Sequence, residues 1–285
     1  PYSNVSRLFR RDPRIRWSRP YHSMIDDSVT EILQQEPHWR VANCAEPALL
    51  HDGYRPELLN QSDKAERLRR SMEQWLEDQP DDPYACTKLG ALEVSSGNHE
   101  RGVNLLRKGL GQLPDGAGRT AERYELLLNL GIALAPEDAD AAESYYRQAL
   151  DLALDVRLSL GARLNLAALL MQANQLDEAI QLTTTACQRA PEVALAWYNL
   201  GLMERRRGDL AASLRAYERS LELNPDHAES HQNFAVARLM GGDIDGARAS
   251  FRAAIDKLRQ QNRAKEAGAL QAQVSGIVKL DGSAQ

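Results

Sequence analysis

The clearest pattern in this chain is a set of apolar and small residues that recurs every 34 positions. The segment AWYNLGLMERRRGDLAASLRAYERSLELNP ends at Pro225, and ARLNLAALLMQANQLDEAIQLTTTACQRAP ends 34 residues earlier at Pro191. A third copy, ESHQNFAVARLMGGDIDGARASFRAAIDKL, follows with the same displacement of 34. Each copy holds two blocks of helically spaced apolar residues separated by a turn, which predicts two antiparallel helices.

Two earlier copies carry the same pattern with altered connections. They are YACTKLGALEVSSGNHERGVNLLRKGLGQLP and YELLLNLGIALAPEDADAAESYYRQALDLAL, and the turn of the second is one residue short before Ala142. The five copies begin near residues 83, 124, 160, 194 and 228, so steps of 41 and 36 precede two steps of 34. We therefore expect five helix pairs over residues 83–261, which bury their apolar faces only by stacking on one another.

The copy that begins at Ala194 resembles the tetratricopeptide repeat (TPR). The matching residues are Trp197, Leu200, Gly201, Gly208, Tyr217, Leu221 and Pro225. The resemblance implies an all-α, right-handed solenoid in which Trp197, Tyr217, Phe251 and Tyr146 are core. Residues 262–280 form an amphipathic pattern that predicts a capping helix, with the C-terminal tail running on to residue 285.

In this family ligands bind on the concave side, which is formed by the first helix of each pair. The exposed positions expected there include Leu195, Glu229, Leu239 and Met240. The candidate peptide-binding residues are Asn129, Asn165, Tyr198, Asn199, Leu202, Arg205, Arg206, Gln232, Asn233 and Val236. The four asparagines occupy one repeat position, where their amides could bind the backbone of an extended peptide. The alternative is that asparagine is simply common at this position.

The family also has a clamp for carboxylate-terminated peptides, which needs lysines in the groove. The corresponding positions here carry Thr87, Leu128, Leu164 and Tyr198, which disfavours such a clamp.

Few residues suggest metal binding or catalysis within the repeats. His227 and His231 are four residues apart, a spacing that could hold a metal, but no third ligand is apparent and we expect no metal site. Asp81 and Asp82 follow Pro80 and are expected to cap the next helix. We find no phosphate-binding loop, nucleophile elbow or paired-cysteine motif, so no complete active site is visible.

Residues 1–20 are basic in an otherwise acidic chain. Six arginines and one aspartate give these residues a charge of +5. Because the formal net charge of the whole chain is −5, the remaining residues carry a charge of −10. The segments RLFRR and IRWSR alternate polar and apolar residues, which predicts two short strands joined by the turn RDPR. PALLHDGY, residues 47–54, is a further strand candidate, and SDKAERLRRSMEQWLEDQP predicts a connecting helix within residues 62–82.

Residues 1–82 resemble the C-terminal end of a family 2 glycosyltransferase domain, with residues 1–61 as its partial α/β segment and Lys64 and Arg67 as matching residues of the following helix. The motifs Arg-Leu-Phe-Arg at residues 7–10, His22, and His51-x-Gly53-Tyr54 occur in the order typical of that family before its repeats. The resemblance implies a small α/β segment in which Arg7, Arg10 and His22 are candidate catalytic residues. The nucleotide sugar and divalent metal of such an enzyme would belong to a half that is absent here, so no cofactor is expected in this chain.

Other roles for the N-terminal arginines stay open. They could protect a strand edge, contact a phosphate or bind nucleic acid, although a pI near 5.8 disfavours nucleic acid as a partner. The absence of an initiating methionine favours a fragment of a longer protein. The odd count of three cysteines argues against a disulfide framework and, together with the lack of a signal sequence or an apolar span, favours the cytoplasm.

Three functions follow from these observations. The first is an interaction module that holds a peptide or protein in its groove. The second is a contribution to the sugar-transfer site of a longer enzyme. The third is a scaffold that self-associates through exposed repeat edges.

Overall fold

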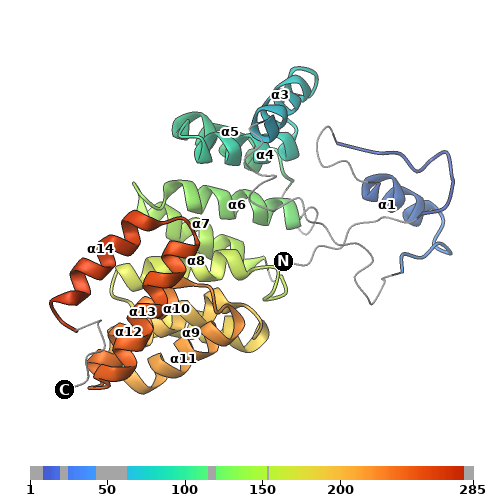
Figure 1. Ribbon diagram of the computed structural model, residues 1–285. Coiled ribbons are helices and arrows are strands. Elements are labelled where there is room, and N and C mark those ends of the chain that lie inside the picture. Colours follow the sequence, from blue (N-terminus) through green and yellow to red (C-terminus); the bar gives the residue numbers. More distant parts are fainter. Residues whose placement is uncertain (1–8, 20–24, 43–62, 115–119, 153, 279–285) are drawn as a thin grey trace. The chain divides into compact units, whose positions relative to one another are not determined.

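The structure is a computed structural model that describes residues 9–19, 25–42, 63–114, 120–152 and 154–278. These residues contain thirteen helices and no strand (Figure 1). The helices are α1 (Asp26–Gln35), α3 (Asp63–Asp78), α4 (Pro83–Ser95), α5 (His99–Gly111), α6 (Thr120–Leu134), α7 (Ala139–Asp151), α8 (Leu160–Gln172), α9 (Leu176–Arg189), α10 (Ala194–Arg207), α11 (Leu210–Leu223), α12 (Ala228–Met240), α13 (Ile244–Gln260) and α14 (Ala264–Ser275). The predicted all-helical repeats are therefore present as helix pairs.

The chain forms two compact units, residues 1–129 and 130–285, with the boundary inside α6. In the first unit α3 packs on α4 through Met72, Ala85 and Leu89, which are all buried. Asp82 accepts a hydrogen bond from the backbone N–H of Ala85 at 2.7 Å, which confirms the predicted cap of α4.

A buried ion pair fixes α3 against α4. The Glu93 side chain is fully buried, and one of its carboxylate oxygens accepts a hydrogen bond from Arg69 Nε at 2.8 Å. The other oxygen accepts from Asn98 at 2.5 Å. Burial alone would raise the pKa of Glu93, but the hydrogen bonds from Arg69 and Asn98 outweigh it, so the pKa is lowered. The carboxylate is therefore charged and paired in the folded protein.

In the second unit each helix packs on its neighbours in sequence from α7 to α14. The predicted core aromatics Tyr146, Tyr217 and Phe251 are 2%, 0% and 3% exposed. Trp197 is only partly buried, and its indole N–H donates to the Pro191 carbonyl at 3.0 Å. Core aromatics were thus predicted correctly, with Trp197 at the edge of its cluster.

The turn between the two helices of a repeat has a consistent backbone conformation. At its fifteenth position Gly97, Asn174, Gly208 and Gly242 all have positive φ, between 63° and 95°. Glycine and asparagine tolerate this left-handed region best, which explains why they stand there. The repeat that begins near residue 124 has Asp138 at this position with φ of −141°, because its turn is one residue shorter.

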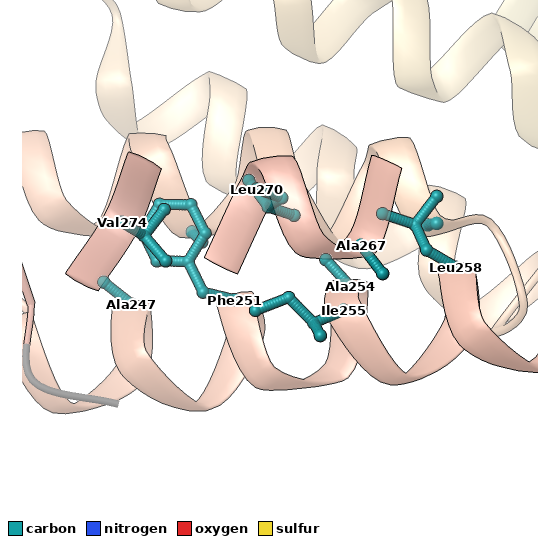
Figure 2. Packing of buried hydrophobic residues seen from close by; sticks show 10 residues of the cluster. Ala247, Phe251, Ala254, Ile255, Leu258, Ala267, Leu270 and Val274 are labelled. Atoms are coloured by element: carbon teal, nitrogen blue, oxygen red, sulfur yellow. The ribbon is translucent and has the colours of Figure 1, made fainter. Parts of the chain in front are cut away.

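Helix α14 ends the repeat array as the capping pattern predicted. Figure 2 shows Ala267, Leu270 and Val274 packed against α13, where they meet Phe251 and Ile255 among other buried side chains. The remaining residues of α14 are exposed and are small or polar. A terminal repeat with a polar outer face is what a soluble array requires.

The strands expected around residues 7–19 are wrong for the part that the structure describes. Residues 9–19 contain a turn at residues 13–14 but no strand, and this segment lies along α1 instead. Ser28 of α1 accepts a hydrogen bond from the Arg16 backbone N–H at 3.0 Å and donates to the Arg16 carbonyl at 3.1 Å. A helix side chain satisfies the backbone groups that a second strand would otherwise bind. Residues 47–54 lie outside the described residues.

Candidate functional site

The first helices α8, α10 and α12 lie side by side, since α10 contacts both of the others. Two columns of half-buried side chains recur along them at the sixth and ninth positions of each repeat. The sixth-position residues are Asn165, Asn199 and Asn233, and the ninth-position residues are Ala168, Leu202 and Val236. We call these six residues the first-helix face. It combines an amide column with an apolar column, a pairing that suits main-chain and side-chain contacts of a ligand.

The amides of this face differ in their partners. Asn233 donates to the Glu229 carbonyl at 3.0 Å and to the Tyr198 hydroxyl at 3.2 Å. Among the described residues no side-chain hydrogen bond reaches Asn165 or Asn199. Asn129, in the first unit, donates to the Glu125 carbonyl at 2.7 Å. Two adjacent amides of the predicted column are thus available, whereas Asn129 is engaged within its own helix and Asn233 is engaged both within α12 and with Tyr198 of α10.

Tyr198 is more buried than a groove residue is expected to be. Its ring lies edge-on to His227 with 4.9 Å between centroids and 6.2 Å from Tyr217. Burial raises the pKa of Tyr198, with the Glu229 carboxylate adding to the effect, so the phenol stays neutral. Tyr198 therefore positions the Asn233 side chain through its hydroxyl, in addition to any contact that it makes with a ligand.

A shallow hollow of about 420 Å³ opens near the C-terminal ends of these three helices. Its lining residues are Met171 of α8, Leu202, Arg205 and Arg206 of α10, and Met240 of α12. Sequence reasoning named four of these five among the exposed positions and missed Met171. The signal was present, because Met171 lies 34 residues before Arg205 and so occupies the same repeat position.

The three arginines that end α10 have different environments. Arg207 pairs with Glu204 at 2.6 Å, and Arg205 donates to the Asn233 side-chain oxygen at 3.2 Å. The Nε atom of Arg205 is buried without a hydrogen-bond partner. Arg206 is exposed and makes no ion pair within the part of the chain that the structure describes. The hollow is thus lined by two guanidinium groups and by no carboxylate.

The histidine pair has structural roles. His227 caps α12, because its Nδ1 atom accepts a hydrogen bond from the backbone N–H of Ser230 at 3.2 Å. The Nε2 atom of His231 donates to the Pro225 carbonyl at 2.9 Å. No cluster of three metal-ligating side chains occurs within the described ranges. The His227 imidazole therefore caps the start of α12, and the His231 imidazole connects this helix to the preceding turn.

Other predicted site residues lie away from this face or outside the described residues. Gln232 is half-buried on α12 and is not one of the six residues of the first-helix face. Arg10 is exposed, with its guanidinium 5.6 Å from the centre of the Trp39 ring. Arg7 and His22 lie outside the described residues, as does Cys44. Cys86 and Cys187 are free and buried, and burial raises the pKa of Cys187 to about 12.

Comparison with known proteins fits the repeat geometry. Two family models described as tetratricopeptide repeat match residues 194–227 and 216–249. The chain contains tetratricopeptide repeats. A TPR repeat-containing protein of Synechococcus elongatus is 38% identical over 262 residues, which are 92% of this chain and 64% of that protein. FlbA of Caulobacter vibrioides is 37% identical over 89 residues, 31% of this chain and 15% of its own length.

Solved TPR structures share the fold. YrrB, described as a TPR protein with an unusual peptide-binding site, superimposes with a TM-score of 0.50 at 18% identity, covering 70% of this chain and 97% of YrrB. MamA from Desulfovibrio magneticus RS-1 gives 0.51 at 22% identity, with coverage of 70% and 97%. The predicted all-α solenoid class is confirmed. None of the TPR helices, nor any other helix that the structure describes, is long and apolar enough to cross a membrane.

Proposed function

We propose that the second unit is a protein-interaction module that binds an extended peptide along the first-helix face. The observation that carries this proposal is the pair of unpartnered amides, Asn165 and Asn199, on adjacent helices beside the apolar Ala168 and Leu202. An asparagine side chain offers both a donor and an acceptor, which is what a peptide group requires. The apolar column beside it would hold the peptide's side chains.

The spacing of the amides suggests a register for such a peptide. Axes of packed helices are about 8–10 Å apart. An extended chain advances about 3.3 Å per residue. Asn165 and Asn199 would therefore bind peptide groups about three residues apart.

The test is the double variant Asn165→Ala, Asn199→Ala. Binding would be measured by fluorescence polarisation with a decapeptide selected from a randomised library, acetylated and amidated at its ends. Two lost hydrogen bonds of about 1 kcal/mol each predict a loss of affinity of roughly 30-fold. The matched control is Asn104→Ala, an exposed asparagine on α5, which should leave the affinity unchanged. Unchanged affinity of the double variant, or failure of the library to yield any binder, would refute the proposal.

A second proposal concerns residues 1–61, which we infer to be part of a sugar-transferring domain in a longer protein. It rests on the order of motifs at Arg7, Arg10, His22 and His51, and on the exposed Arg10, for which no carboxylate partner lies among the described residues. The chain also spans only 64% of its Synechococcus relative, which leaves room there for further domains. The nucleotide sugar and divalent metal would be bound outside this chain.

This second proposal is tested in a longer protein that carries the chain. Release of nucleoside diphosphate from a nucleotide sugar should fall after Arg10→Ala, and should not fall after Arg40→Ala, which removes another exposed arginine nearby in sequence. Equal rates for both variants and the parent protein would remove Arg10 from the site.

Self-association and a cytoplasmic location stay predictions. Helix α14 covers one end of the array, so stacking there would have to use its small and polar outer face. Sedimentation velocity at several concentrations measures self-association directly, and a concentration-independent coefficient would exclude the scaffold role.

A further inference from the structure

We propose that the hollow between α8, α10 and α12 selects a peptide that carries an aspartate or glutamate side chain next to a large apolar residue. This inference rests on the proposed peptide-binding function and adds the chemistry of the partner. The occupant is an internal acidic–apolar pair of the bound peptide, with its carboxylate on Arg206 and its apolar side chain between the methionines.

The charge of the hollow is uncompensated. Among its five lining residues two are arginines and none is acidic. Arg206 is exposed without an ion-pair partner among the described residues. By contrast, the next residue, Arg207, pairs with Glu204 at 2.6 Å. Glu204 supplies the counter-charge of Arg207, and a carboxylate that entered the hollow would do the same for Arg206.

The two arginines of the hollow differ in how far they are available to a ligand. The Nε atom of Arg205 is shielded from solvent, and the Nη2 atom of the same guanidinium donates to Asn233. A ligand carboxylate can accept from the exposed guanidinium of Arg206, whose donors form a fork that matches a carboxylate.

Helix electrostatics explain only part of this arrangement. Basic residues in the last turn of a helix interact favourably with its macrodipole, which accounts for the run of arginines at the end of α10. The macrodipole gives no reason for the lack of an ion-pair partner at Arg206 among the described residues. Nor does it account for the apolar groups that surround the two guanidiniums.

The apolar wall is built from flexible side chains. Met171, Leu202 and Met240 line the hollow, and Met240 is 56% exposed. Methionine adapts to different apolar partners because it is unbranched and polarizable. These three residues therefore fit a large apolar side chain such as leucine, methionine or phenylalanine rather than a single shape.

The position of the hollow favours a side-chain carboxylate over a chain terminus. Its walls come from all three first helices, with Met171 on α8 and Met240 on α12 on either side of Arg206. A peptide that follows the asparagine column from α8 toward α12 passes the hollow without ending there. The carboxylate must then come from a residue within the peptide.

The experiment compares two libraries of acetylated, amidated decapeptides that differ only in a fixed central pair, Glu-Leu or Gln-Leu. The full chain is immobilised, and retained peptides are counted at low and at moderate salt. We expect the Glu-Leu library to be retained about tenfold more than the Gln-Leu library, with the preference falling as salt rises. R206E should abolish or reverse the preference, whereas R215E, which makes the same charge change at an exposed arginine of α11, should keep it.

The outcomes separate the two proposals. Equal retention of both libraries, sensitive to the Asn165→Ala, Asn199→Ala variant, overturns the acidic–apolar preference and leaves the peptide-binding function standing. Retention of neither library overturns both. A third library, Gln-Leu with a free C-terminus, tests the source of the carboxylate. If only that library is retained, and R206E abolishes its retention, the occupant is a chain terminus and the proposal is wrong.

Discussion

Replacing Gly201 by alanine should destabilise the second unit, although alanine is the better helix former. A Cβ atom at Gly201 would lie 2.6 Å from Cε1 and 2.7 Å from Cδ1 of Tyr217. Carbon atoms pack best about 3.5–4.0 Å apart, so the ring would have to move by roughly 0.9 Å. Tyr217 is 0% exposed and packs against Phe234 and Tyr198, which leaves the ring no free space.

The magnitude follows from two opposing effects. Overpacking of a close-packed site costs about 1–3 kcal/mol. Alanine in place of glycine within a helix contributes about 1 kcal/mol in the other direction. The net change for Gly201→Ala is therefore a loss of about 0–2 kcal/mol of unfolding free energy.

Gly268→Ala is the matched control, because it makes the same chemical change within a helix. Gly268 lies inside α14, and a Cβ atom there would have no neighbour within 4 Å. This variant should gain about 1 kcal/mol, so the two variants should differ by the overpacking cost of about 1–3 kcal/mol.

The assay is urea unfolding followed by circular dichroism. If both variants shift the unfolding midpoint upward equally, the reasoning about Tyr217 is refuted. Tyr217→Leu supplies a second check, since it shortens the side chain that clashes. In that background Gly201→Ala should cost less than in the parent chain, and an unchanged cost would place the strain elsewhere.

Two substitutions and one labelling experiment test further features of the structure. Glu93→Gln should cost about 3 kcal/mol by breaking the buried pair with Arg69, measured by urea unfolding of the full chain. Because the pKa of Glu93 is lowered in the folded state, its contribution is present above the ordinary pKa of about 4.3 and is lost as pH falls through the lowered value. The parent chain should therefore lose more stability in acid than the variant, and identical pH profiles would contradict this. Asp209→Ala should cost about 1 kcal/mol in the same assay by removing the cap of α11, where the Asp209 carboxylate accepts from the Ala212 N–H at 2.9 Å; an unchanged midpoint would count against the cap. Cys187 should react with iodoacetamide only after denaturant is added, because burial raises its pKa to about 12; mass spectrometry of the native chain showing labelled Cys187 would contradict its burial.

The helix pairs could be predicted because each repeat encodes its own local structure. Small residues such as Gly201 stand where a facing ring approaches, and Gly208 stands where the backbone needs positive φ. These requirements are satisfied within one repeat, so the residues that meet them recur in the sequence at a fixed spacing. The sequence pattern of helix α1 is weaker. Its buried residue Ile32 and the preceding Ile25 are seven residues apart, which is helical spacing, but the alternating residues before it drew attention to strands.

The candidate site depended on contacts between repeats. The sequence places asparagine at one position of four repeats, but only the structure shows that Asn129 and Asn233 bond to their own helices while Asn165 and Asn199 do not. Likewise, the pattern placed Tyr198 in the groove, yet packing against His227 buries much of its ring.

The sequence by itself therefore determined the repeat, its period and its capped helices, since local spacing sets helix ends and apolar faces. Tertiary structure decided which polar groups remain without partners, because that depends on how side chains from different repeats meet. The hollow beside Arg206 is the clearest example. Met171, Arg206 and Met240 are far apart in sequence, and only the packing of α8 and α12 against α10 brings them to one surface.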